Sequence, residues 1–454
     1  MTTKSKPAEL ARTFWHVLRR RGLRAGLGVA LLLALSATVA VRALDREDGR
    51  TPGKGHDPAQ SAPAPFLLPP PPPPPRRGAS QVLPSEVAVP GARVWRVGPG
   101  GNFHTIAEAA REARAGDVVE IEAGDYRGDV ALWEQKRLTI RGVNGAARLY
   151  ADGRSSEGKA IWVMRNGDFD VSNIDFIGAR VAHGNGAGIR FEGGRLRLRH
   201  CLFWGNQTGV LTSNQDIAAD AVLIVEHSEF AYSQVVGRWA HNLYVGTIAS
   251  LTVTGSYFHH ADAGHLLKSR ARVNDILYNR FTDETGGRAS YELDFPNGGV
   301  VRLVGNVVQQ QVGTENPTII SFGEEGYRWP INRLHMGSNT LVNDHARGGT
   351  FLYVAPGAER VVSANNLLVG PGAYRVRDPM LVINDARARW QDLIRPSHLD
   401  YRLASEADEF RYRASAEPGW EASMAPRSVY LHPMTLRQRV AAPLLVGAQA
   451  GPAP

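Results

Sequence analysis

A short repeat is the feature of this sequence that most restricts its fold. The pattern is an apolar residue, two variable positions, a small residue or asparagine, one more variable position, and Phe, Leu or Val. Copies end 23 to 33 residues apart, most often 27, and a period in this range indicates a repeat architecture. The end positions are Phe176, Phe203, Phe230, Phe258, Phe281, Val308, Leu341 and Leu368.

Each repeat contains two or three short segments with alternating apolar residues, separated by turns rich in Gly, Asn and Asp. No long apolar helix lies between these segments, which argues against strand–helix–strand units. A period near 27 is also too short for a four-stranded propeller blade. It fits one coil of a parallel β-helix, in which stacked coils share a continuous core. The sequence therefore predicts an all-β solenoid.

Stacking would align equivalent side chains of successive coils in ladders. The five phenylalanines among the end positions predict an aromatic stack in the core. The residues two positions earlier are Ile174, Cys201, Ser228, Ser256, Asn279, Asn306, Asn339 and Asn366. The four asparagines predict a ladder at a turn, in which amides hydrogen-bond from coil to coil. We interpret the cysteine of this series as a packing residue.

The net charge of +8 comes mainly from one end of the chain. Residues 1–24 contain seven Lys or Arg and one acidic residue, so the rest of the chain carries only +2. The body has no strong basic bias for a phosphate backbone, and we expect no nucleic-acid partner. The single cysteine, Cys201, excludes a disulfide scaffold and a cysteine-based zinc cluster.

The basic N-terminus, residues 1–24, precedes an uncharged apolar run of 17 residues, 25–41. That length is at the short end for a membrane-spanning helix. The Lys and Arg before it predict a cytoplasmic N-terminus. We expect residues 25–44 to be a transmembrane anchor in an inner membrane, with the rest of the chain facing the periplasm. The alternative is a signal peptide, cleaved after Ala40 or Ala43, which would give a secreted protein.

A linker rich in Pro, Gly, Ser and Ala follows at residues 45–90, with seven consecutive prolines at 69–75. Such a run favours an extended polyproline II conformation. Seven residues in that conformation span about 22 Å. We expect a spacer that holds the next domain away from the membrane, in preference to a docking site for a partner.

The two ends of the repeat region carry a family resemblance. The run GGNFHTIAEAAREARAGDVVEIEAGDYRG has apolar residues at helical spacing in 103–115, followed by a strand and a turn. It resembles the N-terminal cap of the pectate-lyase-like, right-handed parallel β-helix proteins, where an amphipathic helix plugs the first coil. The later run DPMLVINDARARWQDLIRPSHLDYRLASEADEF resembles their closing segment. The resemblance implies a right-handed, single-stranded parallel β-helix with a capping helix at 91–410, followed by an irregular tail at 411–454.

Strand alternation predicts which side chains of the repeats face outward. It places Leu243, Val245, Leu267, Ser269, Tyr291, Leu293 and Phe295 inside. The same alternation places Asn242, Tyr244, Lys268, Arg270, Glu292 and Asp294 outside, with His241 and His265 at strand edges. Stacked coils lie about 4.8 Å apart, so these groups should share one outer face. Arg238, Glu324, Glu325 and Arg328 are candidates for its rim.

This combination of groups fits β-elimination in a uronic-acid polymer. Arg270 suits the sugar carboxylate, because a guanidinium binds a carboxylate bidentately. Lys268 is the candidate base if its pKa is lowered, and Tyr244 or His241 is the candidate acid. We assign Asn242, His265, Glu292 and Asp294 to substrate binding. A ladder of ion pairs that serves only solubility and coil register is the alternative.

The segment LKSRARVNDILYNRF resembles the core of alginate lyases and chondroitinase-B-like polysaccharide lyases. In those enzymes a lysine acts as base and an arginine on the next coil as acid. Lys268 matches the lysine, whereas the next coil has Glu292 and Asp294 where a basic residue stands in the family. The family's acidic calcium ligands before the lysine are also missing here, with only Asp262 and His265 nearby. Calcium is therefore a possible cofactor without a clear ligand set, and we assign no metal site.

We favour an exported, membrane-anchored, monomeric β-helix protein that acts on an acidic polysaccharide. The reaction is proton abstraction at C5, either lyase-like β-elimination or epimerisation. The alternative is a non-enzymatic, carbohydrate-binding or cell-envelope scaffold protein. His259 and His260, with Asp262 and His265, are a further candidate for metal binding, although we favour a solvated turn for these adjacent histidines.

Overall fold

The computed structural model describes residues 70–75, 91–213, 219–235, 240–345, 347–414, 424–439, 445–448 and 451–452, all within the unit Pro63–Pro454. The expected basic N-terminus 1–24, the expected anchor 25–44 and most of the linker 45–90 lie outside these residues. Among the helices of the described part, none has the length and apolar character needed to cross a membrane.

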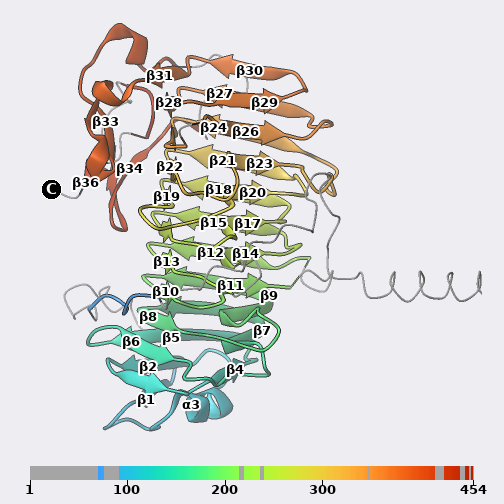
Figure 1. Ribbon diagram of the computed structural model, residues 1–454. Helices are drawn as coiled ribbons and strands as arrows, with labels where there is room; N and C mark the ends of the chain where they lie inside the picture. The colour runs from blue at the N-terminus through green and yellow to red at the C-terminus, as the bar shows by residue number, and fades with distance from the viewer. Residues whose placement is uncertain are drawn as a thin grey trace, which may run out of the picture. The chain divides into compact units, whose positions relative to one another are not determined.

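The described chain forms a parallel β-solenoid of the right-handed type, in which three strands of each coil pair with equivalent strands of the coils before and after (Figure 1). The predicted solenoid is therefore confirmed. We call its three sides the first, second and third face.

The first face contains β4 (Ala131–Trp133), β7 (Ala160–Ser172), β9 (Ala187–Arg199), β11 (Thr208–Thr212), β14 (His241–Val245), β17 (His265–Ser269), β20 (Tyr291–Phe295), β23 (Thr318–Phe322), β26 (Thr350–Val354) and β29 (Ala373–Val376). The second face contains β1 (Val94–Val97), β2 (Val118–Glu122), β5 (Arg137–Val143), β12 (Val222–Glu226), β15 (Ser250–Thr254), β18 (Val273–Leu277), β21 (Val300–Val304), β24 (Arg333–Gly337), β27 (Arg360–Ala364) and β30 (Met380–Ile383). The long strands β7 and β9 pair with strands of both faces.

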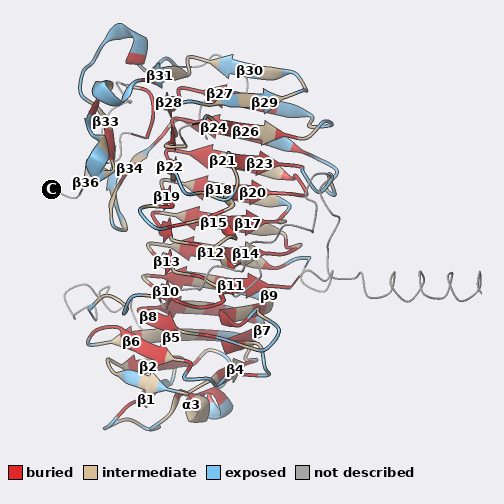
Figure 2. Cartoon of the chain, viewed as in Figure 1, coloured by how far each residue is buried: buried red, intermediate tan, exposed pale blue. Residues whose placement is uncertain are grey.

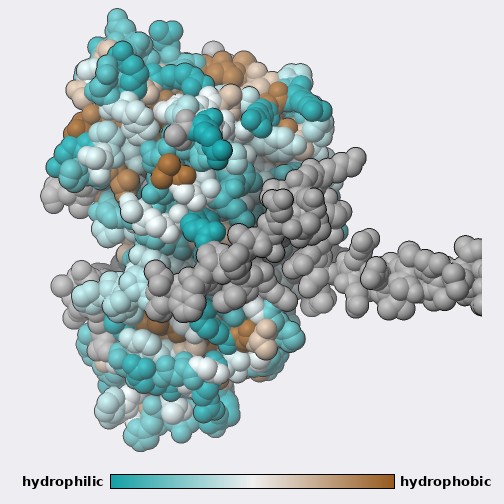
Figure 3. Space-filling view, viewed as in Figure 1, coloured by the Kyte–Doolittle hydropathy of each residue, from teal (hydrophilic) through white to brown (hydrophobic). Residues whose placement is uncertain are grey.

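The third face is a separate 11-stranded sheet. It contains β3 (Asp125–Arg127), β6 (Ala147–Tyr150), β8 (Ile174–Ile177), β10 (Leu202–Trp204), β13 (Glu229–Ala231), β16 (Tyr257–His259), β19 (Arg280–Thr282), β22 (Val307–Gln310), β25 (Thr340–Asn343), β28 (Leu367–Val369) and β31 (Ala386–Ala388). Described side chains visible in Figure 3 are mainly hydrophilic, with hydrophobic residues in small separate patches.

The core contains the predicted aromatic stack. The rings of Phe176, Phe203, Phe230, Phe258 and Phe281 are fully or almost fully buried. Successive ring centroids are 5.0, 4.5, 4.6 and 4.7 Å apart, and each pair of rings is tilted by less than 20°. Stacked burial of this kind stabilises each coil only through its neighbours.

The predicted asparagine ladder is also present. Oδ1 of Asn306 accepts the backbone N–H of Asn279 at 2.9 Å, and Oδ1 of Asn339 accepts that of Asn306 at 3.0 Å. Asn366 bonds to Asn339 in the same way, and Asp385 ends the series. The amide groups satisfy buried backbone donors at a corner where strand pairing is interrupted. The earlier members, Ser228 and Ser256, accept with their hydroxyl oxygens instead.

Helix α3 (Ile106–Glu112) precedes most of the strands and places three apolar side chains in the core. It starts with a capping box, in which Thr105 and Glu108 exchange hydrogen bonds with each other's backbone. Both oxygens of Asp129 accept further backbone N–H groups at its first turn. In Figure 1, α3 lies beside β1 and β4.

The region after residue 389 contains structure that the sequence did not indicate. Antiparallel pairing joins β32 (Leu393–Arg395) to β33 (Asp400–Leu403). The segment expected to be irregular, 411–454, contains the hairpin β34 (Ser428–His432) and β35 (Thr435–Gln438), with β36 (Gly451–Pro452) beside β34. The 3₁₀ helices are Trp390–Asp392, Pro396–His398 and Asp408–Phe410.

Six of the seven consecutive prolines are described, and they contact the third face beside β10 (Figure 1). The indole N–H of Trp204 donates to the carbonyl oxygen of Pro71 at 2.8 Å. The guanidinium of Arg148 donates to the carbonyl oxygen of Pro74. A side-chain carbon at Gly205 would lie 3.0 Å from the ring of Pro70. This part of the expected spacer therefore contacts the β-helix domain, which the spacer was expected to hold away from the membrane.

Candidate functional site

Strand register brings the main candidate residues together on the outer side of the first face. Tyr244 of β14 pairs with Lys268 of β17, which pairs with Asp294 of β20. The three side chains occupy one outward row on successive coils, as alternation predicted. We call these residues, together with Arg270, Glu325, His241 and His265, the first-face site.

Lys268 is buried at the centre of this site and lies between two carboxylates. Its Nζ atom is 2.9 Å from Oδ2 of Asp294 and 2.8 Å from Oε1 of Glu325. The expected outward partner, Glu292, does not contact it. The second partner instead comes from the loop after β23.

Arg270 follows β17 and binds the same loop carboxylate as Lys268. One guanidinium nitrogen, Nη1, lies 2.6 Å from Oε2 of Glu325 and donates to Oδ1 of Asn297 at 2.5 Å. The Nε–H group donates to the hydroxyl of Tyr244 at 3.1 Å. The two oxygens of Glu325 are thus divided between one lysine and one arginine.

These contacts determine the charge states at the centre of the site. Burial by itself would lower the pKa of Lys268, but the charges of Asp294 and Glu325 outweigh it and raise the pKa. Burial would raise the pKa of Asp294, but Lys268 and His265 hold it well below its usual value. The pKa of Glu325 is lowered by Arg270 and Lys268 against the effect of burial. In this arrangement Lys268 keeps its proton, which argues against its expected role as base.

Two histidines extend the site along the coils. Nε2 of His265 lies 3.3 Å from Oδ2 of Asp294. Nδ1 of His265 lies 3.1 Å from Nδ1 of His241. Burial and the neighbouring His265 and Lys268 lower the pKa of His241 well below its usual value, so His241 is neutral near pH 7. Burial also lowers the pKa of His265, although Asp294 opposes that effect.

Two of the expected outward residues, Asn242 and Glu292, point into the interior instead. Register aligns both with Leu266, because Leu243, Leu267 and Leu293 are paired. Leu266 is fully buried in the core next to Leu267, so two consecutive side chains turn inward at this corner. Strict alternation is wrong there, because the strand begins at a bend and not in a flat pleat. Tyr291, expected inside, is half-buried, stacks beside His265 and donates its hydroxyl to Glu324.

Because it lies in the interior, Glu292 has a different partner and a different pKa from those expected of an outward residue. It is fully buried, and its Oε2 atom accepts a long hydrogen bond of 3.4 Å from Gln310. Burial and the nearby Asp283 raise its pKa well above the usual value. Asn242 donates its amide N–H groups to the carbonyl oxygens of Phe230 and His259. Both side chains are buried and turned away from the outer side of the first face, which argues against their expected role in substrate binding.

Glu325 is the central residue that sequence reasoning placed only at the rim. Its loop runs from Gly323 to Gly326, two glycines with positive φ of 81° and 90° that turn the chain back over β20. The only sequence signal was a pair of acidic residues between two glycines. Nothing in it shows that Glu325, rather than Glu324, reaches the lysine of an earlier coil.

The four residues that were considered for metal binding, His259, His260, Asp262 and His265, do not form one cluster. His265 belongs to the first-face site, and Asp262 lies 3.6 Å from Arg288. His259 and His260 stay together on the third face, next to Glu284. The expected partners of this pair, Asp262 and His265, are therefore not its neighbours in that cluster.

Comparisons with known proteins give one structural similarity and no family. No protein-family model and no curated protein matches the chain. Three solved chains match it, and one is the crystal structure of pectate lyase Pel9A. The identity is 11%, the TM-score is 0.49, and the match covers 77% of this chain and 97% of that one. Such a similarity concerns the fold alone. The chain has a parallel β-helix fold, and that assignment rests on its own strand pairing and ladders.

Proposed function

We propose that the first-face site binds a uronic-acid polymer through its carboxylates and abstracts the proton at C5. One observation carries this proposal: Lys268 and Arg270 bind the two oxygens of a single carboxylate, at 2.8 and 2.6 Å. A lysine and an arginine on one strand thus form a preorganised carboxylate site. Glu325 fills it in the free protein, and a sugar carboxylate can replace Glu325 because the chemical group is the same.

In this proposal His241 is the base. The backbone N–H of His265 donates to Nδ1 of His241 at 3.1 Å, so the neutral ring of His241 has its lone pair at Nδ1 and its proton at Nε2. The basic nitrogen of His241 is therefore Nδ1, which becomes available when the bound uronate displaces the N–H group of His265. That nitrogen takes the C5 proton of the uronate, while Arg270 and Lys268 stabilise the negative charge that develops on the carboxylate.

Two outcomes follow from the same intermediate. In β-elimination the C4–O bond breaks, a C4–C5 double bond forms, and the hydroxyl of Tyr244 protonates the leaving oxygen. In epimerisation the C4–O bond stays intact, and C5 receives a proton on the opposite face. Both use Tyr244, which lies next to Arg270 through the 3.1 Å hydrogen bond.

A second candidate function is a non-enzymatic, carbohydrate-binding or cell-envelope scaffold. It is favoured by the pairing at the site, since Lys268 and Arg270 are both already engaged by carboxylates. A network of this kind can serve coil register alone. The two candidates differ in whether hydrogen at C5 exchanges with solvent.

The decisive experiment incubates the protein with pectate, alginate and glycosaminoglycans in D₂O. Ultraviolet absorbance reports unsaturated uronate, and mass spectrometry reports deuterium at C5. We expect product or deuterium with one polymer, and a loss of at least 100-fold for Arg270→Ala and for His241→Gln. Arg302→Ala is the matched control, because it breaks an ion pair with Asp275 on the second face.

Four results decide between the candidates. Product or exchange that is lost in both site variants and kept in Arg302→Ala supports the enzyme. Polymer binding without exchange, lost in Arg270→Ala, supports the scaffold. Neither binding nor exchange with any uronate polymer would overturn both, and so would equal loss in all three variants.

We further propose that residues 25–44 anchor the chain in an inner membrane, or are removed as a signal peptide, and that the β-helix faces the periplasm as a monomer. The apolar run and the preceding basic residues support this topology. Membrane fractionation with periplasmic protease access is the test. A chain that fractionates with cytoplasmic proteins at full length would contradict it.

A further inference from the structure

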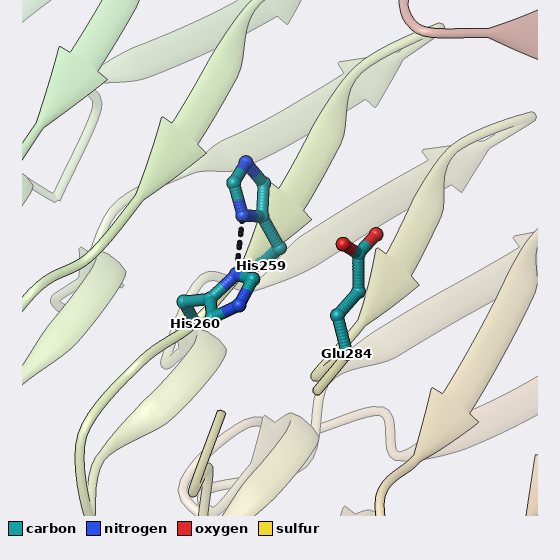
Figure 4. Close-up of side chains that lie close together, drawn as sticks. All are labelled: His259, His260 and Glu284. Atoms are coloured by element: carbon teal, nitrogen blue, oxygen red, sulfur yellow. Dashed lines mark hydrogen bonds between the residues drawn. The ribbon is translucent and has the colours of Figure 1, made fainter. Parts of the chain in front are cut away.

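The outer side of the third face carries a second polar cluster, formed by His259, His260 and Glu284 (Figure 4). One ligand-capable atom of each residue lies within 4.8 Å of the others. His259 ends β16, and His260 follows it in a left-handed conformation with φ of 52°. Glu284 comes from the next coil, after β19, with φ of 56°. The turns at this corner direct the three side chains toward one another.

Hydrogen bonds indicate which nitrogen of each imidazole carries the proton. Nε2 of His259 lies 3.1 Å from Oε1 of Glu229, and an ionised carboxylate only accepts. Nε2 of His260 lies 3.3 Å from the carbonyl oxygen of Thr285, which also only accepts. Each ring therefore donates from Nε2, which leaves Nδ1 as the nitrogen that can bind a metal ion.

These two nitrogens face each other. The distance between Nδ1 of His259 and Nδ1 of His260 is 2.6 Å, drawn as the dashed line in Figure 4. In a hydrogen bond of this length one of the two nitrogens must carry a second proton, and a metal ion bound to both nitrogens would take the place of that proton. Nitrogens bound to one tetrahedral Zn²⁺ at about 2.0–2.1 Å are roughly 3.3 Å apart, so the rings need to separate by only about 0.7 Å.

Glu284 is oriented toward the same two nitrogen atoms. The hydroxyls of Tyr257 and Thr282 both donate to its Oε1 atom. Within the described part of the chain no donor reaches Oε2, which leaves that oxygen for a ligand. Tyr257 and His259 are almost completely buried, so their positions are held by packing as well as by these bonds.

We propose that His259, His260 and Glu284 bind one Zn²⁺ ion through two Nδ1 atoms and one carboxylate oxygen. Two imidazoles and a carboxylate form a donor set that zinc accepts, whereas Ca²⁺ and Mg²⁺ prefer oxygen ligands alone. Glu229 orients the ring of His259 from behind, as carboxylates do at many zinc sites. Three protein ligands leave a fourth position for water. The site is separate from the first-face site and does not depend on the proposed function.

The test is a zinc titration of the untagged, chelator-treated full chain, by calorimetry and by metal analysis of the washed protein. We expect one zinc ion per chain. The double variant His260→Asn, Glu284→Gln should lose that ion. Glu229→Gln keeps all three ligands and should bind one ion with an affinity lower by about 10–100-fold.

Two control variants locate the ion. His398→Asn removes an exposed histidine whose ring hydrogen-bonds to Ser397, and His241→Asn breaks the histidine pair of the first-face site. Both should keep one zinc ion. The proposal is overturned if the wild-type chain binds no zinc, if the double variant still binds it, or if His241→Asn loses it. Circular dichroism checks folding. If the double variant does not fold, zinc binding by the wild type and by Glu229→Gln tests the proposal instead.

Discussion

At the scale of single residues, buried polar groups are the most informative part of this chain. The asparagine ladder gives each buried amide partners on both neighbouring coils, as in Asn306, which bonds Asn279 and Asn339. Glu292 and Asp283 are buried without such compensation, since each has a side-chain oxygen that meets no donor among the described residues. Buried amides with hydrogen-bond partners stabilise the stack, whereas buried carboxyl groups without such partners are tolerated only in their neutral form.

The first prediction concerns the proton of Asp283. Burial, with Asp262 and Glu284 nearby, raises its pKa to about 8. The folded state therefore binds a proton that the unfolded state, with a pKa of about 3.9, releases. This stabilisation is complete below about pH 4 and is lost as the pH rises to about 8. The melting temperature of Asp283→Asn, relative to wild type, should rise by several degrees between pH 4 and pH 8 in thermal unfolding.

Asp392→Asn is the matched control for that measurement. Arg389 lowers the pKa of Asp392, so the sign of its contribution is opposite. The relative melting temperature of this control should stay constant or fall as the pH rises. A flat difference for Asp283→Asn over the same range would show that Asp283 is ionised in the folded protein.

At the scale of elements, loops and linkers supply contacts that the strands do not make. The loop after β23 places Glu325 against Lys268 of β17 and against Arg270, which follows β17. A ligand carboxylate must displace Glu325 before it can bind there. If uronates bind there as proposed, the loop lowers the apparent affinity of the first-face site for them.

The second prediction is that Glu325→Gln binds uronate oligomers more tightly than wild type, by about 3- to 10-fold. The neutral amide competes less strongly for Lys268 and Arg270. Calorimetric titration with oligogalacturonate and with oligomannuronate measures this affinity.

Glu324→Gln is the control for the loop, because Glu324 bonds Tyr291 and Ser321 and touches neither cation. Its affinity for the same oligomers should stay within about twofold of wild type. Weaker binding by Glu325→Gln would mean that Glu325 itself contacts the sugar.

The third prediction concerns the proline segment on the third face. Trp204→Phe keeps the aromatic surface beneath Pro71 and removes the indole N–H that bonds its carbonyl oxygen. One lost hydrogen bond corresponds to about 1 kcal/mol of unfolding free energy. Urea unfolding should show a decrease of that size.

Two further variants test whether the decrease comes from the segment. Trp390→Phe changes an exposed tryptophan elsewhere and should leave stability unchanged. Replacing residues 70–75 with a Gly-Ser sequence should abolish the difference between Trp204 and Phe at this position. A difference of the same size in both backgrounds would show that Trp204 stabilises the fold without the prolines.

At the scale of the whole described molecule, stability is distributed along a stack of coils. Each coil contacts mainly its neighbours, so opening should begin where a coil has a neighbour on one side only. The strands β29 and β30 close one end of the stack and are largely exposed, unlike β14, β17 and β20 (Figure 2).

The fourth prediction follows from this asymmetry. Amide hydrogen exchange, followed by mass spectrometry of peptides, should be faster in Ala373–Val376 and Met380–Ile383 than in His265–Ser269 by at least 100-fold. Leu352→Ala, at the coil next to this end, should speed exchange in the end strands without changing the central ones. Uniform protection along the stack would indicate that the whole solenoid opens in one step.

The sequence alone determined the ladders and the coil architecture. A period near 27 aligns Phe203 with Phe230 and Asn279 with Asn306 in any stack of equal coils, because one side chain repeats at one place in each coil. Alternation also placed Lys268 and Asp294 correctly, since β17 and β20 are flat at those positions.

Only the tertiary structure decided which distant residues contact one another and which way side chains point at the corners of the coils. Asn242 and Glu292 turn inward because two consecutive residues face the core where a strand meets a bend, and a rule of period two cannot describe a bend. Glu325 reaches Lys268 across two coils, and the prolines reach Trp204 from far along the chain. Such contacts depend on the path of a loop through space. Local periodicity specifies which way a strand's side chains point, but it carries no information about where a loop ends.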